Sequence, residues 1–163
     1  MQRIASPHAL WLVGAVALAA TGSVFAAEAP YRGEGTPLFV QPGELEWQPV
    51  ASMAPGAEIA VIEGNLGEAE PFTFRLRLPA DYVVSPHVHP AYERVTVLAG
   101  TFHFAHGEAF DRDRTTPLGV GSVAIMPPGA PMFGFTEEET VIQLHGQGPW
   151  GLHYVDPADD PRS

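Results

Sequence analysis

The chain has 163 residues, a length that suits a single domain, and a formal net charge of −11. It contains no lysine and no cysteine, which excludes disulfide bonds and thiolate chemistry. An acidic chain of this kind repels phosphate backbones and anionic membrane surfaces, so no nucleic-acid partner is expected.

The first element along the chain is an apolar N-terminal segment. Arg3 precedes an apolar run over residues 9–20, and the small-residue pattern Val24-Phe25-Ala26 follows. This order is typical of a secretory signal peptide, so we predict a signal peptide over residues 1–26, cleaved after Ala26. The alternative is an uncleaved N-terminal anchor, although the run is short for a membrane span. We therefore expect an exported protein, periplasmic or secreted, with no membrane association after cleavage.

The rest of the chain has the pattern of short strands. Residues 27–56 are rich in Pro, Gly and Glu and are predicted to form an extended arm with one or two short strands. Over residues 57–157, β-branched and aromatic runs are separated by Gly and Pro, as in strands joined by turns. No convincing helical period appears there, so the predicted fold class is all-β, a sandwich or barrel. Residues 158–163 are predicted to form a C-terminal tail.

Two of these runs alternate with a period of two, which gives each strand two different faces. In "FTFRLRLP" the polar face carries Arg75 and Arg77, which could hold an anionic substrate group if that face points inward. In "ETVIQLHG" the polar face carries Gln143 and His145, which would then lie near a site inside the protein. If these faces point outward, all four side chains are solvated or bonded at the surface. The pattern leaves both arrangements open.

A candidate metal site lies in "SPHVHPAYERVTVLAG". His87 and His89 stand at i and i+2, so on a strand both imidazoles point to the same face. Glu93 opens the next strand, and its carboxylate enters the same space if it points inward. Two imidazoles and one carboxylate suit a divalent transition metal such as iron, manganese, zinc, nickel or copper, and leave positions open for water, substrate or dioxygen. The alternative is a polar strand face with no ligand role.

The same stretch resembles the first motif of the cupin superfamily, His-x-His-x3-Glu-x6-Gly, and "GSVAIMPPGAPM" resembles the second. The matching positions are His87, His89, Glu93, Gly100, Gly121, Pro127 and Gly129. The resemblance covers residues 57–157 and is strongest to small, exported, single-domain, type-2 cupin-like proteins. It implies a jelly-roll β-barrel with the metal, if present, inside it.

Three positions depart from the motifs. Asp81 stands where the first motif is usually preceded by glycine, and Thr136 stands where asparagine is expected after the second. Met132 replaces the histidine that is the usual fourth metal ligand. Three readings follow: a three-ligand site with Met132 as an apolar wall, a copper site with Met132 as a thioether ligand, or a barrel that has lost its metal and binds an organic ligand.

These observations leave several functions open. A metal with open positions could support a dioxygenase or isomerase of unknown substrate, with Glu93 or His145 as a general base. A non-catalytic barrel could instead hold a metal or a small ligand, and a structural barrel could keep only a vestigial site. The expected partner is a small-molecule ligand or substrate. The arm could also pair across a homodimer.

Overall fold

The computed structural model describes Tyr31, Gly35 and residues 37–163. The predicted signal peptide, residues 1–26, lies outside the described residues, as does much of the first part of the predicted arm. Within the described part of the chain, no helix is long and apolar enough to cross a membrane.

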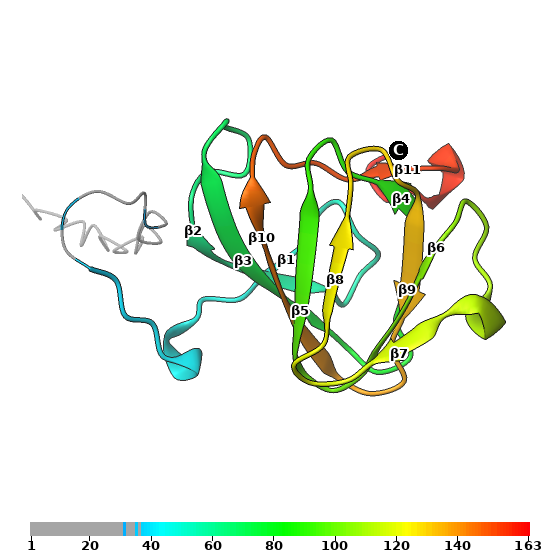
Figure 1. The fold of residues 1–163 in the computed structure, drawn as a ribbon, viewed down its shortest axis with the longest axis horizontal. Coiled ribbons are helices and arrows are strands. Elements are labelled where there is room, and N and C mark those ends of the chain that lie inside the picture. The colour runs from blue at the N-terminus through cyan, green and yellow to red at the C-terminus, as the bar shows by residue number, and fades with distance from the viewer. Residues whose placement is uncertain (1–30, 32–34, 36) are drawn as a thin grey trace, which may run out of the picture.

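The described residues form two antiparallel sheets that face each other (Figure 1), which confirms the all-β class. One sheet has the strand order β1-β2-β3-β10-β5-β8 and the other has the order β11-β4-β9-β6-β7. The strands are β1 (Gln48–Pro49), β2 (Glu58–Glu63), β3 (Pro71–Leu78), β4 (Val83–Val88), β5 (Glu93–Ala99), β6 (Phe102–His106), β7 (Thr116–Leu118), β8 (Val123–Met126), β9 (Met132–Phe135), β10 (Thr140–Gln147) and β11 (His153–Tyr154). Short 3-10 turns are η1 (Pro42–Glu44), η2 (Arg112–Arg114) and η3 (Pro157–Asp159).

Alternation along β3 and β10 decides which face of the first sheet forms the interior. Phe74 and Leu76 on β3, and Ile142 and Leu144 on β10, are buried and point between the sheets. Burying these apolar side chains is worth roughly 25 cal/mol for each Å² removed from water, whereas burying unpaired guanidinium groups would be costly. The polar face of both strands therefore points outward.

A β-bulge in β4 sets the direction of the histidines. The register of β4 against β9 shifts between Val84 and His87. A bulge re-aims the side chains that follow it. Because of this shift, Val84 and His87 both line the interior although they are three residues apart. His89 follows two residues later and points the same way.

The turn before β4 holds Asp81 in a backbone conformation that usually requires glycine. Asp81 has a φ of 58°, in the left-handed region, and no other non-glycine residue of the described chain has a positive φ. Aspartate tolerates this region better than most residues, because its short polar side chain can bond locally. The substitution therefore keeps the turn that the cupin glycine would form.

Residues 50–57, between β1 and β2, are held against the barrel by two tyrosines. Tyr82 donates its hydroxyl hydrogen to the Ala54 carbonyl at 2.6 Å, and Tyr154 donates to the Ser52 carbonyl at 2.9 Å. Met53 is buried between them in the core. The segment thus forms part of the wall of the interior cavity.

Candidate functional site

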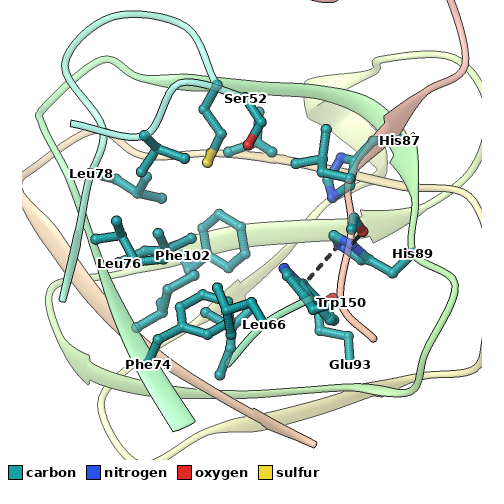
Figure 2. A pocket seen from close by; sticks show the side chains of 18 of the residues that line it. Ser52, Leu66, Phe74, Leu76, Leu78, His87, His89, Glu93, Phe102 and Trp150 are labelled. Atoms are coloured by element: carbon teal, nitrogen blue, oxygen red, sulfur yellow. Dashed lines mark hydrogen bonds and ion pairs between the residues drawn. The ribbon is translucent and has the colours of Figure 1, made fainter. Parts of the chain in front are cut away.

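A cavity of about 290 Å³ lies between the two sheets. Most of its wall is apolar, and its polar side chains are few. Figure 2 shows His87, His89 and Glu93 on one side of this cavity and Leu76 and Leu78 on the other. The two motif histidines and the motif glutamate therefore meet at one interior space, although β4 and β5 belong to different sheets.

Each histidine is oriented by a backbone carbonyl. His87 donates its Nδ1 hydrogen to the Ser85 carbonyl at 2.7 Å, and His89 donates to the Gly151 carbonyl at 2.6 Å. A carbonyl oxygen only accepts, so Nδ1 must carry the hydrogen in both rings. The neutral rings then keep a lone pair on Nε2, which is the arrangement of histidines that bind metal ions.

Glu93 lies beside His89 and has the same buried environment. Nε2 of His89 is 3.5 Å from Oε1 of Glu93, which is at the outer limit of a hydrogen bond. Nε2 of His89 and Oε2 of Glu93 are both buried without a hydrogen-bond partner. Buried polar atoms without partners cost free energy, so their presence indicates a site that is completed by another group.

The electrostatics of the site favour uncharged side chains while no cation is bound. Burial raises the pKa of Glu93 to about 8. Burial, followed by the neighbouring His87, lowers the pKa of His89 to about 3. Burial also lowers the pKa of His87, against the opposing effect of its bond to Ser85. Neutral imidazoles at ordinary pH are the form that can donate an electron pair to a metal.

The segment between β10 and β11 packs over His89. The indole of Trp150 stacks on the His89 ring with centroids 3.9 Å apart and planes 21° from parallel. Gly151, the next residue, provides the carbonyl that accepts from His89. This segment therefore fixes both the tilt and the tautomer of the ring, although it is distant in the sequence.

Met132 lies close to the site but belongs to the core. It is fully buried at the start of β9 and is paired with His87 across the strands. It packs in the main apolar cluster and is not among the residues that line the cavity. This placement favours the reading of Met132 as an apolar wall behind His87.

The other predicted pocket residues lie elsewhere. On the outer face of the first sheet, Arg75 donates from Nε to Gln143 at 3.1 Å, and Arg77 pairs with Glu58. Arg77 also lies over the Trp47 ring, 4.4 Å from its centroid. His145 points to the same outer face, with a buried Nδ1 that has no partner. None of the four lines the cavity, because the apolar faces of β3 and β10 occupy it.

The three motif residues offer the donor atoms of a metal site, but the structure brings only two of these side chains into polar contact. Within the residues that the structure describes, no group of three or more His, Asp or Glu side chains is arranged to hold a metal ion. His89 and Glu93 are the pair already in contact, and His87 stacks edge-on against His89 with ring centroids 4.8 Å apart. The donor types fit a divalent transition metal, as expected from the sequence.

Sequence reasoning did not single out two side chains that line the cavity as site residues. Arg162 lies in the predicted tail "ADDPRS", where a lone arginine among acidic residues is only a weak signal. Trp150 lies in "GQGPWG", and nothing in this sequence context indicates contact with a histidine 61 positions earlier. Long-range packing alone brings both to the site.

Comparison with solved structures confirms the fold. KdgF from Halomonas sp. is 20% identical with a TM-score of 0.54, and the match covers 69% of this chain and 96% of that one. The polyketide cyclase RemF from Streptomyces resistomycificus is 17% identical with a TM-score of 0.64, covering 78% and 91%. A variant of salicylate 1,2-dioxygenase from Pseudoaminobacter salicylatoxidans is 17% identical with a TM-score of 0.51, covering 61% and 27%. At these identities the likeness shows the fold.

Among curated proteins no match was found. The family model described as the ChrR cupin-like domain matches residues 36–149, which is most of the chain. That span includes both histidines, Glu93 and the second motif. The chain is therefore a member of the ChrR cupin-like domain family, within the cupin superfamily.

Proposed function

We propose that this protein is an exported cupin that binds a divalent transition metal through His87, His89 and Glu93 and takes a small organic molecule into the adjoining cavity. The observation that carries this proposal is the pair of buried imidazoles whose Nδ1 hydrogens are held by backbone carbonyls. Their Nε2 lone pairs are left for another partner. The unpaired Oε2 of Glu93 adds the carboxylate to the set.

The environment supports a cation rather than a further hydrogen bond. Glu93 is 5% exposed and His89 is 3% exposed, and neither has a charged partner of opposite sign other than the weak contact between them. A divalent ion would offset the cost of ionising the buried carboxyl. Because only His89 and Glu93 are already in contact, we expect ion binding to draw His87 toward that pair.

When bound, such a metal supplies a Lewis acid that polarises a substrate oxygen or an open position for dioxygen, the chemistry of an oxygenase or an isomerase. The residues of the chain would orient the metal ligands and shield the bound molecule from water. Trp150 and Gly151 hold the His89 ring, and the Ser85 carbonyl holds His87. The apolar wall excludes water from the ligand, which strengthens electrostatic contacts inside.

A second candidate is a non-catalytic barrel that binds a metal or a small ligand without turnover. Met132 favours it, because an apolar thioether stands at the position where the second cupin motif provides a fourth ligand. The apolar wall of the cavity is equally suited to holding a ligand. Dioxygen consumption by the metal-loaded protein, measured with candidate substrates, separates turnover from binding.

The test is metal content by elemental mass spectrometry. The full chain would be expressed in an exporting host, and the N-terminus of the purified protein would be sequenced. We expect a first residue near 27 and close to one transition-metal ion for each chain. His89→Ala and Glu93→Ala should reduce the metal content at least tenfold. His145→Ala is the matched control, because this histidine lies on the outer face, and it should keep the metal.

An ion titration followed by tryptophan fluorescence gives an independent readout. Trp150 stacks on His89, so binding of a copper or nickel ion should quench its emission. Trp150→Phe should remove the signal while Trp47 still emits. If no ion binds after incubation with iron, manganese, zinc, nickel or copper, the metal site is rejected. Equal metal content in all the alanine variants would place the ion elsewhere.

A further inference from the structure

The cavity is polar at one side and apolar over the rest of its wall. Its volume of about 290 Å³ is roughly twice that of an apolar cavity known to bind benzene, about 150 Å³. It therefore has room for a molecule of about ten to twelve non-hydrogen atoms. Leu76, Leu78 and Phe102 form part of the apolar wall and offer no hydrogen bond. A sugar or other polyol would lose its bonds to water there without replacement.

Arg162 provides a cation on this wall. Among the described residues that line the cavity, it is the sole lysine or arginine, and its side chain is 44% exposed. Its Nη2 donates to the Leu152 carbonyl at 3.0 Å. Leu152 directly follows Gly151, the partner of His89, so this bond places the guanidinium near the polar side of the cavity.

The bonding of Arg162 leaves part of its guanidinium free. Asp160 accepts from Nε at 2.7 Å and from Nη2 at 2.8 Å, and Leu152 takes the second Nη2 hydrogen. A guanidinium has five N–H donors, so both hydrogens of Nη1 remain. Within the described chain, Nη1 has no hydrogen-bond partner. Asp160 and Leu152 therefore hold the guanidinium in place and leave both N–H donors of Nη1 available.

We propose that the ligand is a small monocarboxylic acid with a compact apolar body, whose carboxylate is bound by Nη1 of Arg162. The apolar body lies against Leu76, Leu78 and Phe102. An arginine recognises a carboxylate through charge-assisted bonds, and the apolar wall selects against additional polar groups. This inference rests on the proposal that the cavity takes a small molecule, and it names the chemical class of that molecule.

The test compares sodium octanoate with 1-octanol by isothermal titration calorimetry at pH 7. The two have the same apolar chain, and only octanoate is charged. The full, exported protein is used with and without the metal. We expect octanoate to bind at least tenfold more tightly than octanol. Arg162→Gln should weaken octanoate about tenfold and leave octanol within twofold, while Arg162→Lys should recover part of the loss.

Arg75→Gln is the matched control, because it removes an arginine from the outer face of the same barrel. It should leave both affinities unchanged. Equal affinity for octanoate and octanol would overturn the inference. An equal loss of affinity for both ligands in Arg162→Gln would also overturn it, because Arg162 would then only stabilise the cavity wall. Metal content measured on the same samples keeps the two proposals separate: a protein that binds octanoate but takes up none of the five ions rejects the metal site alone.

Discussion

At the scale of single residues, the site consists of polar groups whose burial in an apolar interior costs free energy. Burial favours the neutral form of each group, so it raises the pKa of Glu93 to about 8 and lowers the pKa of His89 to about 3. No packing requirement explains two imidazoles and a carboxyl in such a place. Their cost to stability is the clearest sign that they serve a ligand.

The first prediction concerns Glu93→Gln in the metal-free protein. The folded pKa of Glu93 is raised from 4.5 to about 8, so its favourable contribution is fully present below pH 4.5 and is lost as pH rises to about 8. The free energy of unfolding of Glu93→Gln, relative to the natural protein, should therefore increase between pH 5 and pH 8.5. Urea unfolding in the presence of a chelator measures this difference.

The histidines do not disturb that comparison. Burial lowers the pKa of both, that of His89 to about 3, so their contribution to stability is reduced at acid pH and grows as pH rises toward 6.5. This happens in both proteins and cancels in the difference. A difference between the two proteins that stays constant across the pH range would contradict the shifted pKa of Glu93.

The second prediction concerns Met132→Leu. Met132 packs in the core behind His87 and does not line the cavity. A swap of similar volume should cost less than about 1.5 kcal/mol of stability and leave the metal content unchanged. Elemental analysis and urea unfolding measure both. A loss confined to copper would instead identify Met132 as a thioether ligand.

At the scale of elements, turns and bulges position the site on otherwise regular strands. The bulge in β4 directs His87 inward, and the segment between β10 and β11 fixes His89. The motif glycines act in the turns. Gly100, between β5 and β6, has a φ of 70°, and a Cβ there would lie 2.6 Å from the Glu139 carbonyl oxygen. Only glycine fits this position.

The third prediction follows from two motif glycines in different surroundings. Gly129 also has a positive φ, of 74°, but a Cβ there would meet nothing within 4 Å. Gly129→Ala should cost roughly 1–2 kcal/mol, the left-handed backbone penalty alone. Gly100→Ala should cost at least twice as much, because the backbone must also move. Thermal unfolding of the two variants gives the ratio, and equal costs would show that the turn at Gly100 relaxes freely.

At the scale of the whole molecule, the part of the arm around η1 extends away from the barrel, whereas β1 and the residues after it pack on it (Figure 1). Apolar side chains before η1 are exposed, Leu38 by 44% and Phe39 by 87%. Exposed apolar groups that adjoin one another are a feature of surfaces that bind another protein. A second copy of the chain is the partner expected from the sequence.

The fourth prediction is therefore a homodimer in solution. Sedimentation velocity should give twice the mass of one chain, and the double change Leu38→Ser, Phe39→Ser should give a single chain. Val120→Ser is the control, since Val120 is 69% exposed but lies in a turn of the barrel. A single chain at every concentration of the natural protein would exclude this role for the arm.

Much of the fold was determined locally. Period-two alternation in "FTFRLRLP" and "ETVIQLHG" predicted strands that the structure confirms as Pro71–Leu78 and Thr140–Gln147. The i and i+2 spacing of His87 and His89 predicted that both rings point to the same face, because alternate positions on a strand share a face. The sequence left open whether Glu93 joins them, since that depends on how the two sheets pack. Composition and the Gly and Pro punctuation were enough for the all-β class.

The tertiary structure alone decided which face of each strand became the interior, and which distant residues completed the site. The apolar faces of β3 and β10 turned inward, which left Arg75, Arg77, Gln143 and His145 outside the cavity. The carbonyl that orients His89 lies 62 residues further along the chain. The sequence by itself determined the strands and the candidate ligands, since these depend on neighbouring residues. The wall around them depends on packing between sheets, which no local pattern encodes.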